Sequence, residues 1–365
     1  MTTWENAMGE QYWKKELAQI IDQHNERHAV RSKVIAYATR DARRQGLFRI
    51  FVLLQQLGFR TRPRNLSSRH IDALMAYWTA QPLPAGGQGT HRIAPQLAKP
   101  FSAAYIQQQL SFLRVYAQWI GKAGLVQGTA HYAKDPKLVA RSYSATRDRS
   151  WEANGVDVDA MIARVSAIDR HVGTQLRLMM AFGLRRKEAV MFCPDAAEVP
   201  AYALPAGHRV GERYVSFLTI ERGTKGGRLR YAAVRTPVQQ YALDEARALV
   251  RSKHGHIGRP GLTLKQSLDL FSNVVRQVGL TRKQLGVTPH GLRHQFAGDL
   301  FFDIAQVKAP VQGGEPQVDA DALKEAYRQV AEQLGHHRPQ ISNAYLGSPR
   351  GVSQQPLDQA HQEAP

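Results

Sequence analysis

Thr288-Pro289-His290-Gly291-Leu292-Arg293-His294 opens a stretch in which apolar residues recur at helical spacing, at Leu292, Phe296 and Leu300. Pro289 has a fixed φ and no backbone donor, which suits the start of a helix with one buried face. His290 and Arg293 then lie one turn apart at the positive end of the helix dipole. An imidazole and a guanidinium placed there can hold an anion such as phosphate, although an isolated pair is as well explained by two solvated surface residues.

Three further stretches add reactive side chains in a fixed order. Residues 181–188 read Ala-Phe-Gly-Leu-Arg-Arg-Lys-Glu, residues 224–228 read Thr-Lys-Gly-Gly-Arg, and Leu334-Gly335-His336 precedes Tyr345 by nine positions. These motifs resemble G-L-R-x-x-E, T-K in a hairpin, H-x-L-R-H and L-G-H plus tyrosine. Their order resembles the catalytic domain of the tyrosine recombinases, the phage-integrase family. By this resemblance, the catalytic residues of the family correspond here to Arg185, Lys225, His290, Arg293, His336 and Tyr345.

The resemblance implies phosphoryl transfer on DNA with Tyr345 as nucleophile. Breaking a phosphodiester also requires neutralisation of charge on the nonbridging oxygens and a proton for the leaving 5′ oxygen. We expect Arg185 and Arg293 to supply the first through bidentate hydrogen bonds, and Lys225 to supply the second.

We expect His290 to accept the tyrosine proton or to donate to a nonbridging oxygen, and His336 to hydrogen-bond the phosphate. Glu188, one turn after Arg185, is expected to support that arginine's helix or to orient a neighbour. His294 is expected to be a packing residue. Two guanidiniums take the place of divalent metals, so we predict no metal, no ATP and no other cofactor.

Composition agrees with a polyanionic partner. The 365 residues include 49 Lys and Arg against 30 Asp and Glu, a net charge of +19. Residues 1–150 hold 22 of these basic residues and only 9 of the acidic ones. A single cysteine, Cys193, excludes an intramolecular disulfide and a multi-cysteine zinc site. No apolar run reaches the length of a membrane helix and no signal-peptide pattern opens the chain, so we expect a cytoplasmic, nucleoid-associated protein.

The apolar patterns predict a mainly α-helical protein with a small antiparallel β-sheet. The sheet is expected as a hairpin of 214–220 and 229–234 with Lys225 at its tip. We expect an N-terminal arm (1–28), a helical core-binding domain (29–128), a basic linker (129–150), a catalytic domain (151–347) and a flexible tail (348–365). Residues 102–126 resemble the end of the core-binding domain of tyrosine recombinases. More residues separate Arg293 from His336 than is usual in the family, and residues 308–316 are expected to form a loop within this insertion.

Basic residues of the helical domain and linker are expected to contact the phosphate backbone of DNA. They are Arg40, Arg43, Arg44, Lys134, Lys137, Arg141, Arg147 and Arg149.

The resemblance implies a site-specific recombinase that integrates or excises a mobile element through a covalent 3′-phosphotyrosine. The expected partner is a double-stranded DNA attachment site, bound by a homotetramer on two duplexes that is a monomer or dimer without DNA, with a possible directionality factor. A type IB-like topoisomerase and a non-catalytic DNA-binding protein are the alternatives. A metal hydrolase using His290 and His294 is disfavoured because no glutamate base lies between them.

Overall fold

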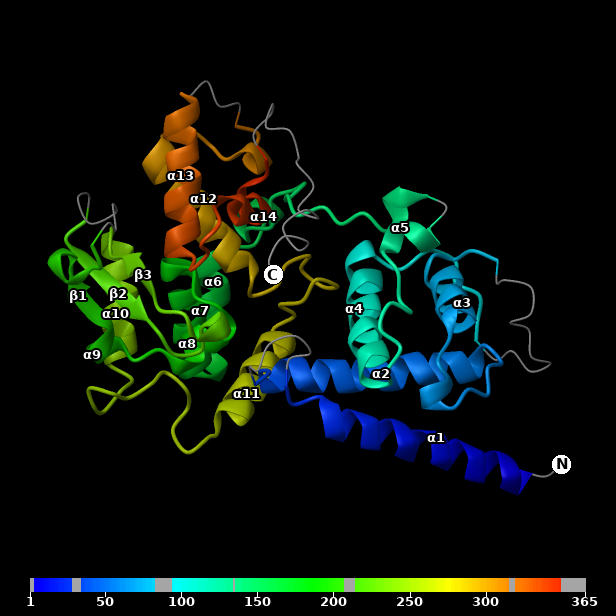
Figure 1. Ribbon diagram of the computed structural model, residues 1–365. Helices are drawn as coiled ribbons and strands as arrows, with labels where there is room; N and C mark the ends of the chain where they lie inside the picture. The colour runs from blue at the N-terminus through cyan, green and yellow to red at the C-terminus, as the bar shows by residue number, and fades with distance from the viewer. Residues whose placement is uncertain are drawn as a thin grey trace. The chain divides into compact units, whose positions relative to one another are not determined.

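The computed structural model describes residues 3–27, 34–82, 94–133, 135–206, 214–314 and 319–348, with only the backbone for residues 3–11. Contacts divide the chain into two compact units, Met1–Arg141 and Ser142–Pro365, which are described separately (Figure 1). The break falls inside the segment predicted as a linker, and the other predicted domain boundaries stay predictions. The tail predicted over 348–365 lies, beyond Ser348, outside the described residues.

Unit 1 is helical. Its elements are α1 (Thr3–His24), α2 (Tyr37–Gln56), η1 (Pro63–Asn65), α3 (Ser68–Trp78), α4 (Ala103–Trp119), α5 (Thr129–Tyr132) and η2 (Pro136–Leu138). Polar side chains satisfy free backbone amides at the starts of α3 and α4. The Ser102 hydroxyl accepts from the amide of Tyr105 at 3.3 Å, and the backbone of Ser67 donates to Nδ1 of His70 at 3.0 Å.

The N-terminal segment differs from the expected arm. It forms the long helix α1, in which Trp13, Leu17, Ile20 and Ile21 are buried. These side chains belong to the same hydrophobic core as the apolar stripes of α2, α3 and α4. The scattered aromatics of this segment therefore serve the core of unit 1.

Unit 2 combines helices with a small sheet. Its helices are α6 (Val158–Ile168), α7 (Arg170–Phe182), α8 (Arg186–Met191), α9 (Pro194–Ala197), α10 (Pro237–Arg247), α11 (Leu264–Gln277), α12 (Gly291–Ala305), α13 (Ala320–Gln333) and α14 (Asn343–Leu346). Its strands are β1 (Glu198–Pro200), β2 (Ser216–Ile220) and β3 (Arg230–Ala233), and its short 3₁₀ turns are η3 (Glu152–Asn154), η4 (Ala201–Ala203), η6 (Lys225–Gly227), η7 (Pro310–Gln312) and η8 (Pro339–Ser342). The mainly helical fold with a small antiparallel sheet was therefore predicted correctly.

The sheet has the order β1-β2-β3 and both pairings are antiparallel. The hairpin of β2 and β3 was predicted, but its register was not. In the structure Phe217 lies opposite Ala233 and Ile220 opposite Arg230. Strand β1 was not predicted, because its three residues, Glu-Val-Pro, are too few to show an alternating pattern.

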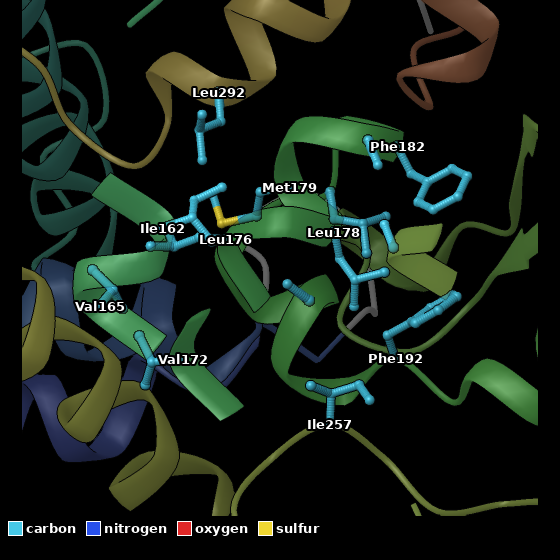
Figure 2. Close-up of a cluster of buried hydrophobic side chains, with 14 of the residues drawn as sticks. Ile162, Val165, Val172, Leu176, Leu178, Met179, Phe182, Phe192, Ile257 and Leu292 are labelled. Atoms are coloured by element: carbon cyan, nitrogen blue, oxygen red, sulfur yellow. The ribbon is translucent and has the colours of Figure 1, made fainter. Parts of the chain in front are cut away.

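The larger core of unit 2 is built around α7, which packs against α6, α10 and α12. Figure 2 shows part of a buried cluster with Leu176, Met179 and Phe182 of α7 beside Leu292 of α12. Trp151 is fully buried in this core, and its indole Nε1 donates to the carbonyl oxygen of Thr288 at 2.8 Å. The residues just before α12 are thereby fixed to the start of unit 2.

A second core lies between α12, α13 and α14, and includes Phe296, Leu300, Val330 and Leu346. Helix α12 thus contributes to two cores, and every residue from Gly291 to Gly298 is buried. The sequence predicted one buried face for this helix, whereas the structure buries both faces. Helical periodicity shows the apolar face but does not show that other helices also pack on the opposite face.

Among the described residues, no helix combines the length and the apolar character needed to cross a membrane.

Replacing Gly46 of α2 by alanine tests the packing of unit 1. In a free helix this change stabilises by up to about 1 kcal/mol. Here the added methyl group would lie 2.4 Å from the ring of Phe112, and overpacking costs typically about 1–3 kcal/mol. We expect Gly46→Ala to lower the urea midpoint of unfolding. Gly128→Ala is the control, since nothing lies within 4 Å of its added carbon. A midpoint for Gly46→Ala at or above that of the wild type would contradict the packing.

Candidate active site

Arg293 of α12 is the centre of a polar cluster inside unit 2, and its side chain is fully buried. Its Nε donates to the hydroxyl of Tyr345 at 3.1 Å. Its Nη2 donates to the carbonyl oxygen of Leu334 at 2.6 Å, and its Nη1 donates to the carbonyl oxygen of Gly183. One guanidinium therefore joins α12 to the ends of α7 and α13 and to the tyrosine.

Glu188 of α8 supplies the negative charge of the cluster and is also fully buried. Its carboxylate accepts from Nη1 of Arg185 at 2.5 Å and from Nη2 of Arg230 at 2.8 Å, and it lies 3.9 Å from Nη1 of Arg293. Burial by itself would raise the pKa of Glu188, but these three guanidiniums outweigh it and hold that pKa at about 2. Glu188 therefore orients three arginines at once.

The ends of α7 and α13 face these arginines with unsatisfied carbonyl oxygens. At the end of α13, Gly335 has φ +72° and donates to Glu332, while the amide of His336 donates to Ala331, which is a Schellman cap. The carbonyl oxygens of Gln333 and Leu334 then accept hydrogen bonds from arginines of the cluster. Leu334 accepts from Arg293 and, at 3.4 Å, from Nη2 of Arg185. Cations at helix C-termini are also favoured by the helix dipole.

Tyr345 of α14 lies against this cluster with 9% of its surface exposed. Its ring centre is 4.9 Å from that of His294, 6.0 Å from that of His336 and 6.1 Å from that of His290. The structure thus brings together Arg185, Glu188, His290, Arg293, His336 and Tyr345 from segments far apart in the sequence.

All three imidazoles next to Tyr345 have lowered pKa values. Burial, followed by the charges of Arg293 and Arg185, lowers the pKa of His336 to about 3. Burial and the neighbouring His290 lower that of His294 to about 3. His290 keeps an exposed edge, and partial burial with the charge of Arg293 lowers its pKa to about 4. The rings are therefore neutral near pH 7 and can accept a proton.

Lys225 stands apart from the other predicted catalytic residues. It lies at the hairpin tip with an exposed side chain, in a turn where Gly226 and Gly227 have positive φ. Its connection to the cluster is electrostatic, since its charge contributes to the lowered pKa of His336.

The predicted DNA contacts of unit 1 stay predictions, and one of these residues, Arg43, is buried. Arg43 is only 8% exposed, donates to the amide oxygen of Asn25 at 3.0 Å and lies over the ring of Trp119. Arg40 forms an ion pair with Glu26 at 3.0 Å, and Arg44 forms one with Asp22. Helix α1 and the residues after it thus supply ion-pair partners to arginines of α2 whose side chains stay partly exposed.

Five basic residues of the linker were predicted to contact DNA. Lys137, Arg141, Arg147 and Arg149 are exposed, and their contacts with DNA stay predictions. Lys134 lies outside the described residues.

Arg230 is the residue of the cluster that sequence reasoning missed. It is 3% exposed, donates to Glu188, and also donates to the carbonyl oxygens of Gln333 and Gly183. Its neighbours in β3 are apolar, so an arginine at an inward-facing strand position was a signal for a buried partner. Of the three histidine rings beside Tyr345, that of His294, predicted to be a packing residue, lies nearest to the tyrosine ring.

The two histidines considered for a metal hydrolase are neighbours at the start of α12. His290 and His294 lie edge to face with ring centres 5.4 Å apart. Within the part of the chain that the structure describes, no group of three His, Cys, Asp or Glu side chains is placed to hold a metal ion.

Arg230→Met tests whether Glu188 depends on this hidden arginine. Glu188 has a folded pKa below its ordinary value, so its contribution to stability is present above about pH 4.5 and is lost as the pH falls through about 2. Removing Arg230 raises that pKa and leaves a buried charge less compensated, at a cost of about 3 kcal/mol. We expect acid unfolding to begin at higher pH, measured by circular dichroism. Arg228→Met, an exposed change on the same hairpin, should leave the acid midpoint unchanged; equal midpoints for both variants would contradict the network.

Comparison with known proteins agrees with this geometry. The family model described as Integrase matches residues 144–299, which include Arg185, Lys225, His290 and Arg293 and end before His336 and Tyr345. No curated protein matches the chain.

Similar solved structures include a lambda integrase(75–356) dimer bound to a COC′ core site, with 15% identity, 95% of this chain and 98% of that chain covered, and a TM-score of 0.48. XerH bound to a difH substrate has 16% identity, coverage of 91% and 80%, and a TM-score of 0.45. The Tn1549 transposon integrase with circular intermediate DNA has 11% identity, coverage of 94% and 97%, and a TM-score of 0.45. Residues 144–299 are therefore similar to the integrase family.

Proposed function

We propose that this protein is a site-specific tyrosine recombinase that cleaves and rejoins DNA at specific attachment sites through a covalent 3′-phosphotyrosine, and so integrates or excises a mobile element. The observation that carries the proposal is the hydrogen bond of 3.1 Å from Nε of Arg293 to the hydroxyl of Tyr345, inside a ring of three neutral imidazoles. The candidate nucleophile, Tyr345, therefore lies next to a candidate oxyanion donor, Arg293, and next to imidazoles that could act as bases.

Arg293 and Arg185 are proposed to hold the scissile phosphate. The side chain of Arg185 is 23% exposed, and it keeps donors available beside its ion pair with Glu188. Arg293 presents its Nε where the hydroxyl of Tyr345 now accepts, so a phosphate placed between the two residues would meet donor and nucleophile together. Preorganised donors of this kind stabilise charge that develops in the transition state.

The histidines are proposed to manage the proton of the tyrosine. Because their pKa values are low in the DNA-free protein, His290 and His336 begin as neutral bases. A phosphodiester beside them adds negative charge, which favours the protonated imidazole and so assists proton transfer from Tyr345. The same rings can then hydrogen-bond the nonbridging oxygens.

Lys225 is proposed to protonate the leaving 5′ oxygen. Its exposed position on a hairpin tip fits a residue that reaches the DNA strand only when DNA is bound. The bond between Tyr345 and the phosphate conserves the energy of the phosphodiester, so the reaction needs no ATP, and the arginines make a metal unnecessary.

The proposed partner is double-stranded DNA carrying attachment sites, with two duplexes held by a homotetramer that is a monomer or dimer without DNA. A solved structure of lambda integrase is a tetramer bound to a Holliday junction, which is a precedent for this assembly. A directionality factor would select between integration and excision.

Tyr345→Phe tests the nucleophile. The wild type, incubated with nicked attachment-site DNA in the absence of metal and ATP, should form a protein–DNA adduct on a denaturing gel. Tyr345→Phe should form none while retaining DNA affinity, because only the hydroxyl is removed. Loss of DNA binding in the variant would instead make Tyr345 structural, and absence of an adduct from the DNA-bound wild type would overturn the proposal.

Lys225→Ala tests the general acid. Loss of a positioned acid slows proton transfer typically by about 10²–10⁴-fold. We expect that loss in single-turnover cleavage, and recovery when the leaving 5′ oxygen is replaced by sulfur, because a thiolate leaves without protonation. Arg293→Ala should not be rescued by sulfur, since its loss removes charge stabilisation. A Lys225→Ala variant that stays slow on the sulfur substrate would remove Lys225 from the proposed role.

A further inference from the structure

A cavity of about 90 Å³ lies beside His290, on the side of α12 where the chain enters the helix. Arg147, Arg149 and Arg282 line it, together with His290, Gly291 and His294. All of these residues belong to unit 2. Several water molecules or one phosphate group fit in such a volume.

The cavity is held in place by close backbone packing. A Cβ atom on Gly291 would lie 2.6 Å from the carbonyl oxygen of Arg149 and 2.8 Å from the ring of Trp151. Glycine at position 291 therefore lets the segment of residues 147–151 pack closely against the start of α12. The indole of Trp151 also bonds the carbonyl oxygen of Thr288. Arg147 and Arg149 are therefore carried to the N-terminus of the fifteen-residue helix α12, where the helix dipole favours anions.

His294 gives an independent indication of a ligand. It is 94% buried, since 6% of its surface is exposed, and it lines the cavity. Within the described part of the chain, its Nδ1 finds no hydrogen-bond partner. A buried polar atom of this kind normally has a partner, and burial without one costs free energy. A ligand oxygen in the cavity would supply that partner.

The charges around the cavity favour an anion. The side chains of Arg147, Arg149 and Arg282 that line it are exposed, whereas that of His294 is buried. Asp148 is a nearby acid, and its carboxylate accepts from the amide of Ser150 at 2.7 Å. Its charge raises the pKa of His294, but burial, His290 and Arg149 lower that pKa by more. The lining of the cavity holds three guanidiniums and no carboxylate, which favours an anion.

We propose that this cavity binds a second phosphate of the cleaved DNA strand, one that flanks the scissile phosphate. The inference rests on the proposed function, and it adds Arg282 and His294 to the residues that position the substrate. His290 lies between the two places, because it lines the cavity and its ring is 6.1 Å from that of Tyr345. Holding phosphates on both sides of His290 would fix the register of the strand on the nucleophile.

The experiment uses attachment-site duplexes in which one phosphate at a time, on either side of the cleavage position, is replaced by an uncharged methylphosphonate. We expect one such linkage to weaken binding by the wild type and to have no further effect on Arg282→Ala, because both changes remove the same contact. The salt slope of log K for Arg282→Ala should also be smaller by roughly one, the value for one lost phosphate contact.

Arg251→Ala is the matched control, because Arg251 is an exposed arginine of the same unit outside the cavity. It should keep both the salt slope and the methylphosphonate effect of the wild type. His294→Phe keeps the ring volume without Nδ1 and should also lose that effect; if this buried variant fails to fold, Arg282→Ala alone decides. The proposal is overturned if every methylphosphonate acts on Arg282→Ala as it does on the wild type.

Two further outcomes separate the possible sources of error. If inorganic phosphate weakens DNA binding more than chloride at equal ionic strength while no methylphosphonate matters, the cavity holds a free anion and the DNA assignment is wrong. If the methylphosphonate effect depends on Arg282 but the wild type forms no covalent adduct, the cavity assignment stands and the proposed catalytic function fails.

Discussion

The candidate site depends on three guanidiniums gathered around one buried carboxylate. Arg185, Arg230 and Arg293 share Glu188, and they also bond carbonyl oxygens at the ends of α7 and α13. Removing such charges from water is expensive, and a buried ion pair is seldom a net source of stability. The arrangement instead fixes the positions of the arginines, because each one interacts with the carboxylate of Glu188 and with a carbonyl oxygen at the end of a helix. A phosphate would therefore meet donors whose positions are already fixed, with little left to reorganise.

The same ties explain how a nucleophile on a short helix can be placed accurately. Helix α14 has only four residues and could not hold Tyr345 by itself. It is supported by the core it shares with α12 and α13, by the bond from the hydroxyl of Tyr327 to the carbonyl oxygen of Gly347 at 2.8 Å, and by Arg293. Helix α13, which lies between Arg293 and His336 in the chain, thus contributes packing to the tyrosine.

Helix α12 connects this network to the start of unit 2. Its residues from Gly291 to Gly298 are buried, with Leu292 in one core and Phe296 in the other. At its N-terminus, Gly291 admits the backbone of Arg149, which brings basic residues of the linker beside His290. One helix thereby positions an arginine at the cluster, a histidine between cluster and cavity, and the linker that lines the cavity.

The sequence by itself determined the helical class, the hairpin, the helix that begins at His290 and the order of the catalytic-type residues, because helical periodicity, caps and motif spacing are local properties of the chain. It did not predict Arg230 in the cluster, the unpartnered Nδ1 of His294, the burial of Arg43 or the packing of α1. Each of these depends on which segments, tens of residues apart, come to lie against one another. The local pattern around Arg230 could indicate a buried partner, but the identity of that partner, Glu188, was decided only by the tertiary structure.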